Sequence, residues 1–501
     1  MSTSKTESNK WTGCEIATLF GACMGAIMLT TDITSAGVAL KSIGLALNAS
    51  FASLQWVVNA YNLSFGAFLL TAGSLADLLG RKRIFTLGVI LFNIAALMCG
   101  LAPNGLLLNL SRGLQGVGAA CVLPTASALI ANQFQNSKRG QAYSLLGAAF
   151  GIRLAIGPLL SGALTSFISW RWIFWVNIPL GVAIVFLTVP KIAESKDPEA
   201  KGVDWFGLIT FISFLSLLLF SLINGQEIGW NSPLIKYSLM GALILLLLFV
   251  VVEQQQRNPM FDLTLFRKPT FIAICFLPFM FACGFASLLV YVPLYFQGVY
   301  NYSPLQAGLV MLPMTFPLFV VPLIVSKVQA KIEEKILLST GLIVMVAGML
   351  VMSRLETSRS WLIIIGGLLL IGTGAGMVNA LADYVAVSVA PKERSGMAAG
   401  TFSTMRIVGN ACAIAAIGAV LIAKVQQQLA DTNIVGNISS IANRITRGDL
   451  NGAVELGNGL DFQGAIASYS QALSMVFLFI SGILLLGAIL EFILVRKQDF
   501  N

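Results

Sequence analysis

The stretch GIRLAIGPLLSG, residues 151–162, lies inside a long apolar run and combines three features that limit what it can form. Its glycines, together with Gly147, would thin one side of a helix so that another helix can approach closely. Pro158 would kink that helix. Arg153 stands near the middle of the run, where a charged group is costly and points to function. The stretch predicts a closely packed membrane helix with a charge inside.

Composition extends this prediction to the whole chain. Of the 501 residues, 57% are hydrophobic and 11% are charged, whereas soluble domains carry about 25% charged residues. The mean hydropathy is +0.84. The formal charge of +9 comes from short basic clusters between apolar runs, with no long stripe that would suit nucleic acid. We therefore expect an all-α polytopic membrane protein with no nucleic-acid partner.

A bilayer-spanning helix needs about 20 mostly apolar residues, and fourteen runs meet that length. An even number of spans puts both termini on one side of the membrane. The runs are 15–40, 53–76, 84–102, 105–131, 140–166, 173–190, 205–224, 234–253, 271–296, 304–326, 335–353, 361–386, 396–424 and 466–495.

The basic residues fix the expected orientation. Most of them fall in segments on the same side as the N-terminus, including the run Arg81–Arg83, and the positive-inside rule makes that side cytoplasmic. We expect a multi-pass protein of the inner (plasma) membrane with cytoplasmic termini. The charged loop Lys191–Asp204 would then be cytoplasmic. The long polar loop Val425–Ala465 would be outside, with some structure of its own.

Several kinds of chemistry are disfavoured by what the sequence lacks. There is no histidine, and the seven cysteines show no CxxC spacing, so we expect neither a metal site nor a cofactor. A membrane-embedded enzyme such as an acyltransferase is an alternative, but the sequence shows no clear nucleophile–base constellation for one. No GxxxxGK[ST] pattern suggests an ATP motor. Transport, if it is active, would use an ion gradient.

The stretch GSLADLLGRKR, Gly73 to Arg83, suits a gating loop. Gly73 and Gly80 allow a tight turn between helices. Asp77 could bind a helix N-terminus or a cation, such as Arg81, in one conformation and release it in another. Alternatively, the basic residues only set the topology.

Deep charges suggest a binding site. Arg112 in LSRGLQGVGAA (110–120) and Asp32 in the first helix lie at similar depth, so they form a coupling site or a structural salt bridge. A desolvated aspartate can carry a proton, and a nearby arginine opposes that. Arg153 and Arg406 are also deep, which leaves three arginines facing Asp32. An anionic or zwitterionic group of a ligand would balance this excess positive charge. Alternatively, backbone carbonyls and waters satisfy the arginines without a ligand. Arg153 is then either the partner of Asp32 or a substrate anchor.

A weak internal repeat points to a transporter. KRGQAYSLLGAAFGIR (138–153) parallels ERSGMAAGTFSTMRIVG (393–409), and repeated halves are typical of secondary transporters with the ligand site at the repeat interface. We expect Asn59, Asn62 and Gln115 to line that substrate cavity with the deep charges.

Three of these stretches, GSLADLLGRKR, LSRGLQGVGAA and GPLLSG, resemble signature motifs of the major facilitator superfamily, in particular its fourteen-helix drug:proton antiporter family. The resemblance continues in LQWVVNAYNLSFGAFLL (54–70), WRWIFWVNIPLG (170–181), PMFDLTLFRKPTF (259–271) and YSPLQAGLVMLP (302–313). It implies a major facilitator fold of two six-helix bundles, residues 1–190 and 266–501. Two extra transmembrane helices would lie in the linker 191–265.

The resemblance also implies roles for residues. Asp77 and Arg81 match the inner gating loop, and Asp32 matches an acid linked to proton coupling. Arg112 and Arg406 match arginines of the family's fourth and penultimate helices. The antiporter motif, thought to seal its helix against leak, is matched by Gly151, Gly157, Pro158 and Gly162.

We therefore predict a proton-coupled exporter of small amphipathic compounds that works by alternating access. Its partners would be the substrate, protons and the lipid bilayer, and auxiliary export subunits stay open. Arg153 and Lys41 depart from the family pattern. They favour an alternative, a proton-coupled transporter of one anionic or zwitterionic metabolite or lipid-like compound. A sensor that has the same fold but transports nothing is a further alternative.

Overall fold

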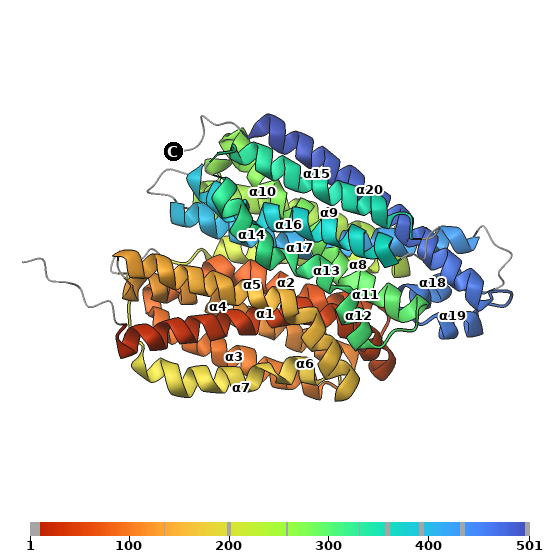
Figure 1. The fold of residues 1–501 in the computed structure, drawn as a ribbon, viewed down its shortest axis with the longest axis horizontal. Helices are drawn as coiled ribbons and strands as arrows, with labels where there is room; N and C mark the ends of the chain where they lie inside the picture. The colour runs from red at the N-terminus through yellow and green to blue at the C-terminus, as the bar shows by residue number, and fades with distance from the viewer. Residues whose placement is uncertain are drawn as a thin grey trace, which may run out of the picture.

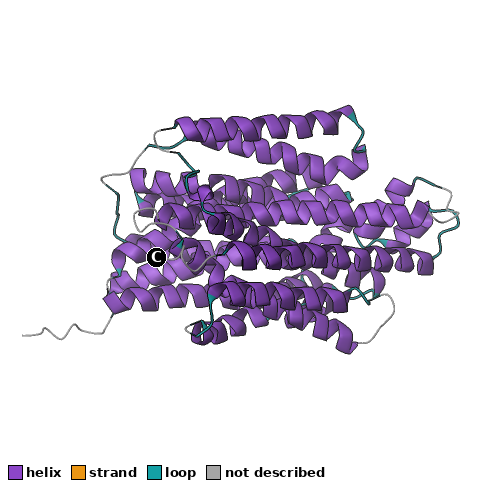
Figure 2. Cartoon of the chain, turned by 90° about the horizontal axis from the view of Figure 1, so that it is seen from above, coloured by secondary structure: helices purple, strands orange, loops and turns teal. Residues whose placement is uncertain are grey.

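The computed structural model describes residues 11–134, 136–197, 202–256, 259–329, 331–355, 361–389, 395–430 and 436–495. Within helices, the side chains of residues 30–35 and 152–155, and of a few other positions, lie outside this description. Nearly all of the described chain is helical, and the helices run roughly along the length of the molecule (Figure 2).

The helices follow one another as long rods with short connections (Figure 1). The first part contains α1 (Gly13–Leu47), α2 (Phe51–Leu79), α3 (Arg81–Leu101), α4 (Gly105–Gln133), α5 (Asn136–Phe167), α6 (Trp172–Trp175), α7 (Asn177–Ala183), η1 (Ile184–Thr188), η2 (Val189–Lys191), α8 (Trp205–Ile228) and α9 (Pro233–Gln255). The second part contains η3 (Leu265–Arg267), α10 (Pro269–Phe281), η4 (Ala282–Ala286), α11 (Ser287–Val299), α12 (Pro304–Val310), α13 (Leu312–Thr315), α14 (Pro317–Val328), α15 (Glu334–Met352), α16 (Trp361–Ser388), α17 (Ser395–Ala430), α18 (Ile438–Thr446), α19 (Leu450–Leu456) and α20 (Phe462–Leu494).

Local sequence explains where many helices begin. The side chains of Ser50, Asn104 and Asp204 accept hydrogen bonds from backbone N–H groups in the first turns of α2, α4 and α8, which satisfies donors that have no partner inside the helix. Proline occupies the first turn of α9, α10 and α12, where its missing N–H costs nothing.

Each of the fourteen predicted spans coincides with helix. Twelve helices or helix runs among the described residues are long and apolar enough to cross a membrane, by length and composition. The spans predicted at 173–190, 271–296 and 304–326 are each interrupted by π-turns or short breaks but read as single spans. α1 and α5 hold the stretches whose side chains are not described, so the count of fourteen stays a prediction.

The two ends of the bundle differ. α1 begins and α20 ends at one end, where the chain also turns from α2 into α3 at Gly80; we call this the gating-loop end. α18 and α19 lie at the opposite end (Figure 1), which we call the outer-loop end.

Three apolar cores share the bundle, and the smallest joins α8 and α9 to α2 and α17. The first joins residues of α1 to η2, including Phe85, Phe92 and Phe134, and a much larger one joins mainly the helices after α9. α8 contacts both α2 and α17, so the pair α8–α9 packs where the two parts of the bundle meet. The domain boundaries after residues 190 and 265 stay predictions.

Candidate functional site

A cavity of about 1540 Å³ lies between the two parts of the bundle. One side is formed by α2, α4 and α5, and the other by η4, α11, α14, α16 and α17. The walls are mostly apolar, with Phe65, Leu69, Phe285, Leu318 and Phe319 among the lining side chains. A cavity of this size with apolar walls and few polar groups is typical of a site for a small organic molecule.

The cavity extends to the gating-loop end. Its lining includes Asp77 at the end of α2, Asp204 at the start of α8 and Asp383 near the end of α16. It also includes Tyr143 near the start of α5 and Met397 near the start of α17. All these positions belong to that end, so the site is reached from there.

At the outer-loop end, α1 and α11 are tied together. Lys41 donates to the Gln297 carbonyl over 2.5 Å, and the Gln297 amide donates to the Val38 carbonyl over 2.8 Å. Deeper in, Gln55 of α2 donates to the Tyr291 hydroxyl over 2.8 Å. These bonds join residues about 240 or more positions apart and close the cavity at this end.

Close backbone crossings reinforce the closure. A Cβ atom on Gly37 would lie 2.0 Å from the Leu289 carbonyl oxygen. A Cβ on Gly162 would lie 2.5 Å from the Pro304 carbonyl oxygen, and one on Gly308 the same distance from the Pro158 carbonyl oxygen. No side chain fits at those distances, so only glycine lets α1 cross α11, and α5 cross α12, this closely.

The antiporter-motif stretch of α5 therefore divides between the two ends. Gly157 and Pro158 are buried, and Gly162 meets α12. Gly151 lines the cavity, facing the Phe319 side chain at ordinary contact distance. The side chain of Arg153 lies outside the described residues.

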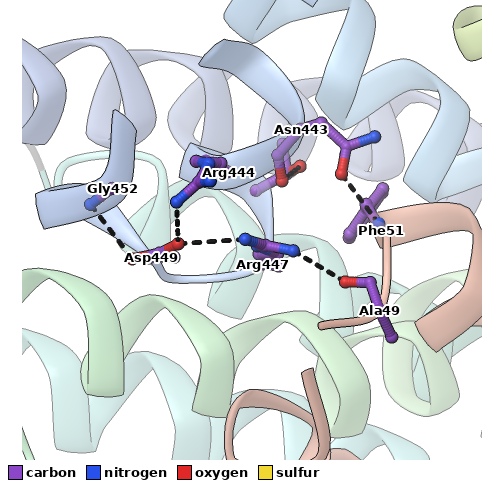
Figure 3. Close-up of polar contacts among 8 residues, drawn as sticks. Ala49, Phe51, Asn443, Arg444, Arg447, Asp449 and Gly452 are labelled. Carbon is purple, nitrogen blue, oxygen red and sulfur yellow. Dashed lines mark hydrogen bonds and ion pairs between the residues drawn. The ribbon is translucent and has the colours of Figure 1, made fainter. Parts of the chain in front are cut away.

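The long outer loop contains two short helices, α18 and α19, which pack on the protein with Ile441, Ala442 and Ile445 buried. Figure 3 shows how α18 and the turn after it reach the first part of the chain. Arg447 donates to the Ala49 carbonyl over 2.7 Å, and the Asn443 side chain accepts from the Phe51 N–H over 2.8 Å. The loop thus bridges both parts of the bundle.

Asp449 holds that bridge in position. It accepts from Arg447 over 3.0 Å and from Arg444 over 3.1 Å, and its other oxygen accepts from the Gly452 N–H. Burial raises the pKa of Asp449, but the hydrogen bonds from Arg447 and Gly452 and the charges of both arginines outweigh it, and the pKa lies below its usual value.

At the gating loop, Asp77 pairs with Arg81, whose nearest guanidinium nitrogen lies 2.9 Å from the carboxylate. Gly80 between them has φ of +119°, which favours glycine. The backbone of the gating loop also forms hydrogen bonds with the segment that follows η2. The Arg81 N–H donates to the Ser195 carbonyl over 2.9 Å, and the Lys82 N–H donates to the Glu194 carboxylate over 3.0 Å. Gly73 lines the cavity.

Arg112 is 1% exposed and is absent from the described cavity lining. It donates to the Val57 carbonyl and to the Gln115 side chain, both over 2.7 Å. Its guanidinium lies 4.5 Å from the centre of the Tyr61 ring. The side chain of its expected partner, Asp32, lies outside the described residues.

Asn59, Asn62 and Gln115 are buried in the helix packing and are likewise absent from that lining. Among the residues that the structure describes, the amide group of Asn59 has no hydrogen-bond partner at either atom. Arg406 does line the cavity, and it pairs with Asp383 at 3.1 Å.

Several lining residues were not proposed from the sequence. They include Asn379, Asn410, Asp197 and Asp204. Asp204 carried a signal, because it immediately precedes an apolar run as an N-cap would. The others stand in helices or loops whose orientation toward the cavity has no sequence signature.

The fold resembles that of solved transporters. A bacterial homolog of the human lysosomal transporter Spinster, in an inward-facing and occupied conformation, matches with a TM-score of 0.67 and 14% identity. The match covers 98% of this chain and 99% of that one. A D-xylose–proton symporter matches with a TM-score of 0.60 and 13% identity, over 96% of this chain and 98% of that one. At such low identity these matches establish the fold alone.

Sequence relatives are closer. Multidrug resistance protein Stp of Mycobacterium tuberculosis is 34% identical over 411 residues, 82% of this chain and 76% of Stp. Drug efflux pump JefA of the same species is 30% identical over 83% of this chain and 82% of JefA. Multidrug resistance protein 3 of Bacillus subtilis is 29% identical over 80% of this chain and 78% of its own length.

The family description "Major Facilitator Superfamily" matches residues 22–414, most of the chain. The matched range and the region aligned with Stp both cover most of the helices described above. The chain therefore belongs to the Major Facilitator Superfamily and is a multi-pass membrane transporter rather than an enzyme.

Proposed function

We propose that this transporter exports small amphipathic compounds in exchange for protons, by alternating access. The observation that carries the proposal is the apolar cavity of about 1540 Å³, which extends to the gating-loop end and is closed at the outer-loop end. The names of the relatives, multidrug resistance proteins and a drug efflux pump, support export of such compounds.

The orientation supports loading from inside. The gating-loop end carries Arg81, Lys82, Arg83, Lys138 and Arg139, and clustered basic residues stay on the cytoplasmic side. The cavity would then face the cytoplasm of the inner (plasma) membrane, as an exporter needs for taking up its substrate.

The charge of the lining favours a cationic amphipath. Among the described lining residues, Asp77, Asp197, Asp204 and Asp383 are acidic and Arg406 is basic. Asp77 and Asp383 are each paired with an arginine, Arg81 and Arg406, and the acids still outnumber the base in the lining. Arg112, which suggested an anionic ligand, is held by carbonyl and amide oxygens elsewhere. The alternative of an anionic or zwitterionic metabolite would rest on Arg153.

The test is transport in energised inverted membrane vesicles, with one cationic dye and a panel of anionic amphiphiles. We expect the wild type to accumulate the dye and to lose the accumulated dye when a protonophore collapses the pH gradient. Arg153→Ala should leave dye accumulation unchanged.

Two results would contradict the proposal. Accumulation that survives the protonophore would exclude coupling to protons. Accumulation of anions alone, abolished by Arg153→Ala, would favour the single-metabolite alternative.

A further inference from the structure

Two acidic residues of the extra helix pair meet beside the cavity. Asp204 immediately precedes α8 and lines the cavity with its neighbour Val203. Glu253 lies two residues before the end of α9, and Met260, just after that helix, also lines the cavity. Neither the gating loop nor the contacts at the outer-loop end involve this pair.

Each carboxyl group uses one oxygen to bind backbone. Asp204 Oδ1 accepts from the Gly207 N–H over 2.8 Å. Glu253 Oε2 accepts from the Phe261 N–H over 3.0 Å. These bonds cap the start of α8 and fix the turn that follows α9, so both side chains are held in place.

The two remaining oxygens converge. Asp204 Oδ2 lies 2.5 Å, and Glu253 Oε1 2.6 Å, from the point that a Cβ atom on Gly207 would occupy. Both oxygens therefore face the same small space beside Gly207. Both oxygens are buried, and among the described residues neither meets a hydrogen-bond donor. Glycine at position 207 leaves the space in which they meet.

No described cation compensates this pair. Asp204 is 9% exposed and Glu253 3%, and no ion pair among the described residues includes either. The nearest elements add mainly acids. Asp197 lines the same cavity, and Asp262 bonds to Thr264.

α2 and α17 pack against α8, and the charged residues that they place at the cavity are paired. On α17, Arg406 is paired with Asp383. On α2, Asp77 is already paired with Arg81. Two buried carboxylates in contact without a cation repel strongly, and burial further disfavours the charged forms, so such pairs retain a proton.

We propose that Asp204 and Glu253 share one proton and form a proton-binding site on the extra helix pair. The proton supplies the donor that the two free oxygens lack, in an O–H···O⁻ hydrogen bond between α8 and α9. Because Asp204 lines the cavity, the site exchanges its proton with water at the gating-loop end.

The site is connected to the gating loop along the chain. Glu194 and Ser195, in the segment that leads toward Asp204, bind the backbone at the start of α3. Loss of the shared proton would leave two repelling charges where α8 joins that segment. The inference does not depend on export, because the proton is bound in the resting protein.

Infrared spectroscopy of the purified full-length protein tests the shared proton directly. A protonated carboxyl group has a C=O stretching band that a carboxylate lacks. We expect the wild type to show such a band for this pair, disappearing as the pH is raised. Glu253→Gln and Asp204→Asn should each remove it, and asparagine still caps α8.

Additivity separates a shared proton from two independent acids. One shared proton predicts that the double variant loses no more band intensity than either single variant. Glu491→Gln is the matched control, since it removes another fully buried carboxyl group on α20, and its loss should add to that of the pair.

Two results overturn the proposal. Unchanged band intensity in both single variants would mean that both groups are ionised, with or without a bound cation. Additive losses would mean two separately protonated acids. If Glu253→Gln is not monodisperse, the test uses the pH titration of the band in Asp204→Asn and in the wild type. A band of full intensity in Asp204→Asn that still titrates would exclude a proton shared by Asp204 and Glu253.

Discussion

At the scale of single residues, the arginines of the membrane helices differ in what they contact. Arg112 is enclosed by α2, α4 and two aromatic rings, with its guanidinium 5.6 Å from the Phe174 ring centre as well. Arg406 stands at the cavity and is neutralised by Asp383. A charge in a membrane helix thus marks either a structural anchor or a site, and the neighbours decide which.

We predict that Arg112→Lys destabilises the protein. Lysine keeps the charge but cannot make two bonds in the fixed geometry of a guanidinium, so the Val57 carbonyl or the Gln115 amide loses its partner. The expected loss is about 1–3 kcal/mol in the free energy of unfolding, measured as a lower melting temperature in detergent. Arg171→Lys, at a half-buried arginine over the Trp170 ring, should change it far less. Equal shifts in both variants would contradict the anchoring role.

We predict that Asp32→Asn abolishes transport driven by a pH gradient while the protein still folds, because asparagine keeps the shape but cannot carry a proton. Dye accumulation in inverted vesicles measures this, with monodispersity in detergent as the folding check. The control is Asp461→Asn at the start of α20, where asparagine caps equally well. Full gradient-driven accumulation in Asp32→Asn would rule out the coupling role.

At the scale of elements, the outer-loop end is held by three kinds of contact. They are backbone crossings at glycines, side chain-to-backbone bonds between α1 and α11, and the bridge from α18 to the start of α2. The crossings fix how closely the helices can approach. The hydrogen bonds are the contacts that must break when this end opens.

We predict that Arg447→Ala favours opening of the outer-loop end. It removes a charge-assisted bond to the Ala49 carbonyl, worth about 1.5–3 kcal/mol, so the open state should gain about ten-fold or more in population. Labelling of the buried position Val38, as Val38→Cys, by an impermeant thiol reagent measures this. Arg444→Ala is the matched control, because the hydrogen bond that Arg444 donates to Asp449 stays within the loop. Equal labelling in both variants would mean that the bridge does not hold the end closed.

The stability of the bridge formed by Arg447 and Asp449 should depend on pH only in the acid range. Because the pKa of Asp449 is lowered in the folded protein, its contribution is present above the ordinary aspartate pKa of about 3.9. It is lost as the pH falls through the lowered value. The thiolate is the reactive form of cysteine, so Val38→Cys labelling is divided by that of an exposed cysteine at the same pH. We predict that this ratio is constant between neutral and mildly acid pH and rises only below about pH 4. A rise that begins near neutral pH would point to another titrating group.

At the scale of the molecule, one end is tied and the other is open. Under the proposed orientation, this arrangement is the inward-facing half of an alternating-access cycle. We predict that a short reversible cross-link between Val38→Cys and Gln297→Cys, in a cysteine-free background, stops transport. Those residues are hydrogen-bonded across the closed end. Adding reductant should restore transport.

A cavity cysteine checks what the cross-link does. Ser403→Cys lines the cavity and should still be labelled from the gating-loop end in the cross-linked protein. Each single cysteine at the outer-loop end is the control. Transport that continues in the cross-linked protein would show that this end need not open.

Much of the architecture could be predicted because a membrane requires each spanning segment to satisfy its own backbone hydrogen bonds. Long apolar runs therefore predict helices such as α2 and α4 within a few residues. The ion pair of Asp77 with Arg81 and the turn at Gly80 could be expected from the sequence, because these residues lie within about one turn of chain. Their role in gating stays a prediction. Which face of a helix meets the cavity was not recognisable, since hydropathy leaves rotation about the helix axis open; Arg112 and Gln115 turn into the helix packing.

The sequence by itself determined the class of protein, most of its helices, its family motifs and the asymmetry of charge on which the proposed orientation rests. Local spacing and apolar run length are sufficient for these, because each acts within one segment. Only the tertiary structure decided which end is closed, that Arg406 pairs with Asp383, and that Asp204 meets Glu253. These depend on how separate helices pack side by side, and no segment contains that information alone.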